Sequence, residues 1–180
     1  MSSSLSIVFM THNSESSLTP DILNLLEIAG DLSSYVELLI IDDGSTDETL
    51  SVARDLARRF PQVYVHHNAM RYGTAAAMQT AMRETVGEFV VFCTETPSVT
   101  ELRKLWSIRT SPKFVMGQPS EQTDHGVLRL IHRPAVVSQF YARSNDNRAD
   151  ERQPTSGPFE ARHEKVASPK RLARGRVSQT

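Results

Sequence analysis

The chain has 180 residues, of which 39% are hydrophobic and 23% are charged, and its formal net charge is −1. This length and composition are typical of one soluble domain, and the balanced charge gives no reason to expect nucleic acid or an anionic membrane as a partner. The single cysteine, Cys93, excludes an intramolecular disulfide and a cysteine-rich zinc site, and it fits a reducing compartment.

The chain also lacks the sequence marks of export or membrane insertion. Its first residues, Met-Ser-Ser-Ser, carry no basic segment, and no apolar run approaches the roughly 18 residues that a membrane-spanning helix needs. We therefore expect a cytoplasmic protein without a membrane span.

The first half of the chain alternates strand patterns with helix patterns. Short apolar runs rich in β-branched residues predict strands over 5–10, 36–41, 63–67 and 89–93. Apolar residues at helical spacing predict helices over 19–29, 46–59 and 74–86, and Gly30 is expected to end the first of them. Strands that alternate with helices form a mainly parallel sheet with flanking helices, so we predict an α/β fold.

The pattern weakens after the fourth strand. Ser98 and Glu101 have the spacing of a capping box, which predicts a further helix. Residues 113–116 and 127–131 are expected to form strands, and residues 134–141 a short last helix.

The composition changes near Arg143. Residues 1–143 carry 12 Lys and Arg against 16 Asp and Glu, whereas residues 144–180 carry 8 against 5. The second segment has too few large apolar residues to offset the entropy of ordering it. We predict one domain over residues 1–143 and a disordered basic tail over 144–180, with an anionic partner for the tail as the less favoured alternative.

The residues that follow the four strands are the first candidates for a site, because ligands of parallel sheets bind beyond the carboxyl ends of the strands. Polar residues stand at all four ends, and we expect them to meet at one edge: Thr11-His12-Asn13, Asp42-Asp43-Gly44, residues 68–73, and Thr94-Glu95-Thr96.

The segment Asp42-Asp43-Gly44-Ser45-Thr46-Asp47 is the most informative of these. A carboxylate at a strand end can accept hydrogen bonds from a base N–H or a ribose hydroxyl, and the next helix N-terminus suits an anion. In the alternative interpretation, Asp42 only caps the turn while Ser45 or Thr46 caps the helix.

Four segments in one order over residues 5–97 closely resemble the N-terminal half of family 2 glycosyltransferases, which have the GT-A fold. They are Thr-His-Asn, Asp-Asp-Gly-Ser-Thr-Asp, the run from Arg71 to Ala81, and Gly-Glu-Phe-Val-Val-Phe. The resemblance implies that a UDP- or GDP-sugar binds at this edge and that its sugar passes to an acceptor hydroxyl. It implies nucleotide-binding roles for Thr11, His12, Asn13, Asp42, Asp43, Arg71 and Gly73.

Within that set the roles differ. Asp43 is our choice for the contact to the base or the ribose, and His12 stands where the family usually has a base-stacking tyrosine. Arg71 replaces a usual asparagine, and it either reaches a phosphate or is solvated.

Two departures from the family bear on catalysis. The family's Asp-x-Asp motif holds Mg²⁺ or Mn²⁺ against the diphosphate, but Thr94-Glu95-Thr96 stands in its place and leaves Glu95 as a weak candidate ligand. Residues 114–118 resemble the family's next strand, and the segment from Gly126 resembles its Gly-x-x-Arg-x-x-x-Arg region. The short link between them leaves Glu121 and Asp124 as the candidate bases.

The sequence therefore supports two functions from different classes. The chain is either a transferase domain or a catalytically inactive relative that serves as a nucleotide-sugar binding or interaction module, with a protein partner or a homodimer. A purely structural domain is a third possibility. His66, His67 and Cys93 are expected to have structural roles, because adjacent strand residues face opposite sides and a cysteine in an apolar strand packs in the core.

Overall fold

The computed structural model describes residues 3–110, 116–117 and 126–136. Six strands form one sheet: β1 (Leu5–Thr11), β2 (Val36–Asp43), β3 (Val63–Asn68), β4 (Phe89–Cys93), β5 (Met116–Gly117) and β6 (Leu128–His132). Four helices lie between them: α1 (Leu18–Leu32), α2 (Thr49–Arg59), α3 (Gly73–Glu84) and α4 (Val99–Ile108).

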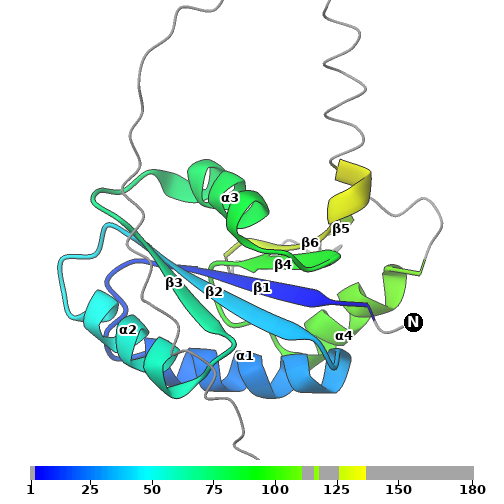
Figure 1. Ribbon diagram of the computed structural model, residues 1–180, viewed down its shortest axis with the longest axis horizontal. Helices are drawn as coiled ribbons and strands as arrows, with labels where there is room; N and C mark the ends of the chain where they lie inside the picture. The colour runs from blue at the N-terminus through cyan, green and yellow to red at the C-terminus, as the bar shows by residue number, and fades with distance from the viewer. Residues whose placement is uncertain (1–2, 111–115, 118–125, 137–180) are drawn as a thin grey trace, which may run out of the picture. The chain divides into compact units, whose positions relative to one another are not determined.

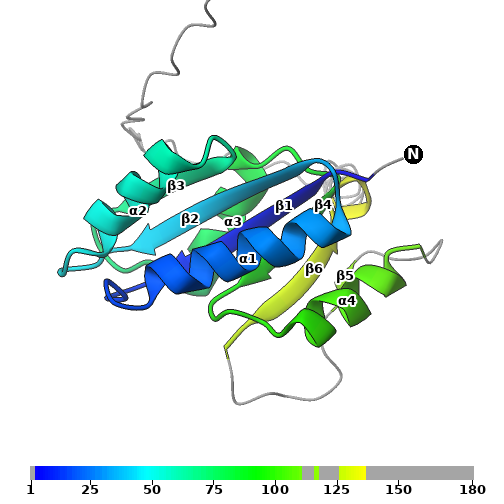
Figure 2. The ribbon, with the colours of Figure 1, turned by 90° about the horizontal axis from the view of Figure 1, so that it is seen from below.

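The sheet is mainly parallel, with the strand order β3-β2-β1-β4-β6-β5. Strands β3, β2, β1 and β4 pair in parallel, while β6 pairs antiparallel with both β4 and β5. This order and these directions confirm the predicted α/β architecture with a mainly parallel sheet (Figures 1 and 2).

Helices cover both faces of the sheet, and the alternation of side chains along β1 explains how (Figure 1). Ile7 and Phe9 pack in a buried cluster with residues of α1, α2 and α4. Val8 and Met10 point the other way, into a second cluster with residues of α3. Strand β1 is therefore buried on both sides, and the candidate functional positions lie at the ends of the strands.

Three predicted helix boundaries were wrong, and one of them is the end of α3, which lies at Glu84 and not at Val86. Helix α1 does not end at Gly30 but continues to Leu32, because Leu32 packs against the core and Gly30 lies in open space. Helix α2 begins at Thr49 and not at Thr46, because the N–H groups of Thr46 and Glu48 are bonded to side chains of another loop.

Most of the other elements match the prediction. The capping box of Ser98 and Glu101 is present at the start of α4, and β6 begins at Leu128, one residue later than expected. Residues 113–115 of a predicted strand, residues 137–141 of the predicted last helix, the tail over 144–180, and the candidate bases Glu121 and Asp124 lie outside the described residues. None of the helices in the described ranges has the length and apolar character to cross a membrane.

Cys93 and the histidine pair occupy structural positions, as expected. The Cys93 thiol is buried and donates to the Val8 carbonyl oxygen at 3.5 Å, and burial raises its pKa. His66 contacts the Glu84 carboxylate at 3.1 Å, whereas His67 contacts Asp42 on the other side of the sheet at 2.9 Å. These two histidines do not share a ligand.

At the amino edge of the sheet, Arg133 holds the end of α3. Its guanidinium donates to the carbonyl oxygens of Gly87 at 2.8 Å and Met82 at 2.6 Å, and to the Thr85 hydroxyl. Burial lowers the pKa of Arg133, and the nearby Glu37 carboxylate opposes that shift. The three acceptors include carbonyls at the C-terminus of α3, where a positive charge is favourable.

We expect Arg133→Met to lower the free energy of unfolding by about 2–4 kcal/mol, because it leaves three acceptors without a donor. Urea denaturation measures this value. Arg103→Met is the matched control, since Arg103 is exposed and its contact with Asp31 is a surface ion pair. Equal stabilities of the two variants would contradict the role assigned to Arg133.

Candidate functional site

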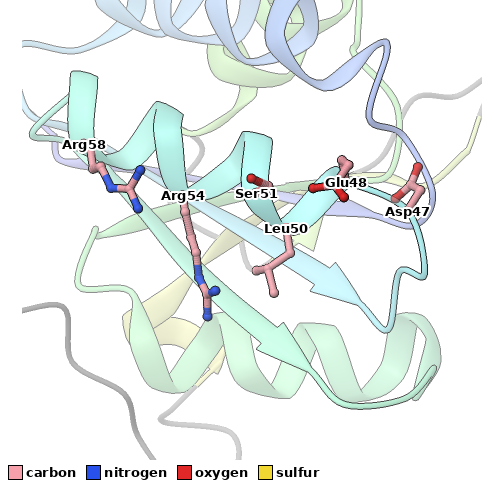
Figure 3. A pocket seen from close by; sticks show the side chains of 6 residues that line it. All are labelled: Asp47, Glu48, Leu50, Ser51, Arg54 and Arg58. Carbon is pink, nitrogen blue, oxygen red and sulfur yellow. The ribbon is translucent and has the colours of Figure 1, made fainter.

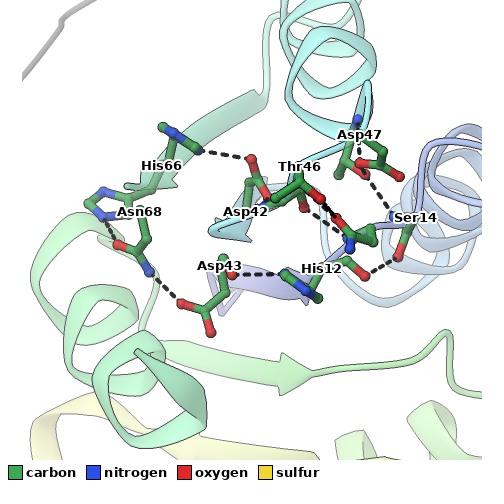
Figure 4. A network of polar contacts seen from close by, with 12 residues as sticks. His12, Ser14, Asp42, Asp43, Thr46, Asp47, His66 and Asn68 are labelled. Carbon is green, nitrogen blue, oxygen red and sulfur yellow. Dashed lines mark hydrogen bonds and ion pairs between the residues drawn. The ribbon is translucent and has the colours of Figure 1, made fainter. Parts of the chain in front are cut away.

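The loops after β1 and β2 are bonded to each other at the carboxyl edge of the sheet (Figure 4). Asn13 has a left-handed backbone with φ of 50°, and its side-chain oxygen accepts a hydrogen bond from Thr46 N at 2.9 Å. The Ser45 hydroxyl accepts from Asn13 N at 2.9 Å. Asn13 thus joins the two loops, and the sequence prediction that they converge is confirmed.

A second set of reciprocal bonds ties the N-terminus of α1 to that of α2. Ser14 N donates to the Thr49 hydroxyl at 2.7 Å, and Glu15 N donates to Asp47 at 3.2 Å. In return, Glu48 N donates to the Glu15 carboxylate at 3.0 Å. These loops have a fixed arrangement before any ligand binds.

Asp42 is buried and both of its carboxylate oxygens have partners in the protein. One oxygen accepts from Ser45 N at 3.1 Å, and the other lies 2.9 Å from His67 Nδ1. Asp42 therefore caps the turn, as the alternative interpretation of the segment expects, but the second part of that interpretation was wrong, because neither Ser45 nor Thr46 caps α2.

Asp43 lies at the junction of the β2, β3 and α3 segments. Its carboxylate is fully buried, so a ligand reaches it only if the β3–α3 loop moves, and it accepts hydrogen bonds from Asn68 Nδ2 at 2.8 Å, Tyr72 N at 2.9 Å and Gly73 N at 2.9 Å. Burial raises its pKa, but these donors and the charge of Arg71 outweigh burial and hold the pKa below its usual value. Asp43 is therefore ionised, and of about four acceptor positions on a carboxylate about one remains open.

His12 and Thr11 lie beside the aspartates. His12 is half-buried, and its Nδ1 donates to the Asp43 carbonyl oxygen at 3.0 Å. Because that oxygen can only accept, Nδ1 carries a proton and the Nε2 of a neutral ring remains an acceptor. Thr11 is buried and pairs with Asp42 in the sheet, and its hydroxyl has no hydrogen-bond partner within the described ranges.

The β3–α3 loop passes close to Gly44. Arg71 and Tyr72 are exposed on this loop, and Gly73 starts α3. Gly44 has φ of +72°, and a Cβ there would lie 2.5 Å from the backbone carbonyl carbon of Met70. Only glycine permits this approach, so the β2–α2 turn and the β3–α3 loop depend on each other.

The residues in place of the metal motif are engaged elsewhere. The Thr94 hydroxyl accepts from Val127 N at 2.8 Å, and the Thr96 hydroxyl donates to Asp21 at 2.7 Å. Glu95 is exposed, and the described part of the chain holds no group of three His, Cys, Asp or Glu placed to bind a metal ion. One carboxylate and two engaged hydroxyls do not fit Mg²⁺ or Mn²⁺.

Sequence reasoning placed Asn68 in the segment 68–73 at this edge but assigned it no role of its own. Asn68 is buried and bridges His66 Nε2 and the Asp43 carboxylate. Its place at the end of the third strand could have indicated this contact, because that position pairs with Asp43 in the parallel sheet.

A hollow of about 320 Å³ lies along α2, and two of its lining residues, Asp47 and Glu48, also bond to the loop after β1 (Figure 3). Both acidic and basic side chains line it, so it does not favour a ligand of one charge. The lining residues are Asp47, Glu48, Leu50, Ser51, Arg54 and Arg58.

Comparisons with known proteins agree with the fold. The model of the family "Glycosyl transferase family 2" matches residues 6–95. An uncharacterized glycosyltransferase of Haemophilus influenzae is 29% identical over 90 residues, which are 49% of this chain and 34% of that protein. The chain therefore spans about a third of the length of this curated relative.

Among solved structures, the mannosyltransferase PcManGT from Pyrobaculum calidifontis, in complex with GDP-Man and Mn²⁺, is similar with a TM-score of 0.60. The match is 20% identical and covers 77% of this chain and 47% of that one. At this level of identity the likeness establishes a shared fold.

Proposed function

Since the chain belongs to glycosyl transferase family 2, we propose that the carboxyl edge of its parallel strands binds the nucleotide part of a UDP- or GDP-sugar. The observation that carries this proposal is Asp43, a buried and ionised carboxylate where three segments meet. A buried charge is costly unless it is satisfied, so three donors hold Asp43 in one orientation. The remaining acceptor position suits a base N–H or a ribose hydroxyl.

The neighbours of Asp43 have matching roles in this proposal. His12 stacks on the base, Asn13 joins the β1–α1 and β2–α2 loops, and Asp42 holds the β2–α2 turn. Thr11 stays a proposed contact because its buried hydroxyl has no partner among the described residues. Arg71, exposed at the start of α3 beside Gly73, is placed to meet a phosphate.

We propose further that the described residues bind the nucleotide sugar without transferring the sugar. The Thr94 and Thr96 hydroxyls favour this non-catalytic function, because both are engaged within the protein and neither is anionic. A metal ion in such enzymes neutralises the charge of the leaving diphosphate. Removing one comparable electrostatic contact costs about 3–4 kcal/mol of transition-state stabilisation, or about a hundredfold to a thousandfold in rate.

Calorimetric titration with UDP, GDP and a panel of their sugars tests the binding function. We expect at least one member to bind, and His12→Ala to weaken that binding by about 5- to 10-fold through loss of about 1 kcal/mol of stacking. Arg103→Met on α4 is the control, since it lies on the opposite face from α3 and should leave the affinity unchanged.

A silent panel with the wild-type chain would reject the binding function. Unchanged affinity in a folded His12→Ala variant would place the nucleotide elsewhere. Release of free sugar or transfer to an acceptor by the purified chain would reject the non-catalytic function.

A further inference from the structure

We propose that Arg129 supplies the positive charge that holds the diphosphate of the bound nucleotide, in place of a divalent cation. This inference rests on the proposed nucleotide binding and names the phosphate contact within that site. It assigns a function to a residue that the sequence analysis treated only as part of a resembling segment.

Arg129 lies on β6 and faces α3. It pairs with Phe92 of β4, and its flanking residues on the same face, Val127 and Ile131, pack in the apolar cluster beside α3. Arg129 is half-buried, and its Nη1 lies 4.0 Å from the sulfur of Met78 on α3. The guanidinium is therefore held against α3 by apolar neighbours.

The hydrogen-bonding capacity of Arg129 is largely unused. A guanidinium has five N–H donors, yet within residues 3–110, 116–117 and 126–136 its one hydrogen bond is this weak contact to a thioether. By contrast Arg133, four residues further along and at the amino edge of the sheet, donates to three oxygen atoms. Solvent reaches a half-buried guanidinium, so an anion that replaces this water would meet donors that the described residues do not use.

The position of Arg129 matches the place where the metal would act. β6 runs antiparallel to β4, so the start of β6 lies at the carboxyl edge of the parallel strands. Thr94 and Val127 bond to each other at that point, with Thr94 N donating to Val127 O at 3.1 Å. Arg129 follows Val127 by two residues and points to the same face.

Asp43 lies on that same face of the sheet, in line with Leu39 and Ile41 of the cluster beside α3. It bonds to Gly73 at the first residue of α3, and Met78 comes five residues later, or about 7.5 Å along the helix axis. Asp43 therefore meets the N-terminus of α3 and Arg129 meets its second turn, and both side chains are on the face of the sheet that α3 covers.

The chemistry of the edge agrees with this assignment. Neutral threonines at 94 and 96 do not repel a diphosphate, whereas two carboxylates without a metal would do so. A guanidinium presents parallel donors that fit phosphate oxygens, and it stays charged at any physiological pH. Glu95 is the exposed carboxylate nearest to this point, and it opposes anion binding weakly through solvent.

The test compares a nucleoside with its diphosphate in the presence of EDTA. We expect Arg129→Met to weaken UDP or GDP binding by about 10- to 100-fold and to leave uridine or guanosine binding unchanged. Arg129→Lys keeps the positive charge but loses the paired N–H donors of the guanidinium, so its affinity for UDP or GDP should lie between those of the wild type and Arg129→Met. Arg103→Met controls for net charge, and a thermal melt of each variant confirms folding.

Glu95→Gln gives an independent readout. It should leave diphosphate binding equal or slightly tighter, because it removes a repelling charge. If Glu95 holds a metal, the same change weakens binding in Mn²⁺, and that result would overturn the inference.

Inorganic pyrophosphate separates this inference from the proposed function. If no nucleotide binds the wild-type chain, the proposed function fails, and loss of pyrophosphate binding in Arg129→Met would still support the anion site. The anion site at Arg129 would be overturned if the wild-type chain and Arg129→Met bind pyrophosphate or UDP with equal affinity. It would also be overturned if the wild-type chain binds neither pyrophosphate nor UDP.

Discussion

Asp43→Ala is expected to lower the free energy of unfolding by about 3–5 kcal/mol, the larger of the effects anticipated for this chain. The change leaves Asn68 Nδ2 and the N–H groups of Tyr72 and Gly73 without their shared acceptor in a buried place. Asp43→Asn keeps the shape but turns one end of the side chain into a donor, so it should also destabilise the fold. Urea denaturation of the three proteins measures both effects.

The Asp43 carboxylate also makes the stability of the fold depend on pH. The pKa of Asp43 is lowered in the folded chain, so the unfolded chain binds the proton more readily. The stabilisation by Asp43 is therefore fully present above the unfolded pKa, about 4, and is lost as pH falls through the lower folded pKa. The difference in stability between wild type and Asp43→Asn should shrink below about pH 4. A constant difference down to pH 2 or so would contradict the assignment.

Gly44→Ala should lower the free energy of unfolding by about 2–4 kcal/mol. A Cβ at Gly44 would lie 2.5 Å from the backbone of Met70, and φ of +72° is unfavourable for alanine. The β3–α3 loop must then move away from the β2–α2 turn, which should also weaken nucleotide binding.

Gly30→Ala is a matched control for that change. Gly30 lies inside α1, and a Cβ there would meet no atom within 4 Å. Alanine is a better helix former than glycine, so this variant should gain about 0.5–1 kcal/mol. Thermal or urea denaturation compares the two, and similar shifts in one direction would contradict the contact inferred at Gly44.

Sequence reasoning located the strands well because each is a short apolar run bounded by polar turns. The convergence of Thr11, Asp43 and Gly73 at one edge also followed from sequence, since parallel strands end on the same side. Helix starts were harder to predict. The start of α2 depends on Asn13 and Glu15, which are more than 30 residues away in sequence, and helix propensity carries no trace of such contacts.

The details of the site could not be predicted for a related reason. The sequence shows that Thr94 and Thr96 are poor metal ligands, but it does not show that Val127 and Asp21 engage their hydroxyls. The sequence placed Arg129 in a segment that resembles the family but gave it no role, and its lack of an oxygen partner among the described residues appears only when β6 is placed against β4 and α3. Contacts between residues far apart in sequence determine both the hydrogen bonds of these threonines and the surroundings of Arg129.

The most direct measurement is the affinity of the wild-type chain for UDP and GDP in EDTA and in saturating Mn²⁺. The proposed site predicts binding in EDTA and affinities that agree within about twofold between the two conditions, because charge for the phosphates comes from the protein. Binding that requires Mn²⁺, or that tightens about tenfold or more with it, would contradict a metal-free nucleotide site at this edge.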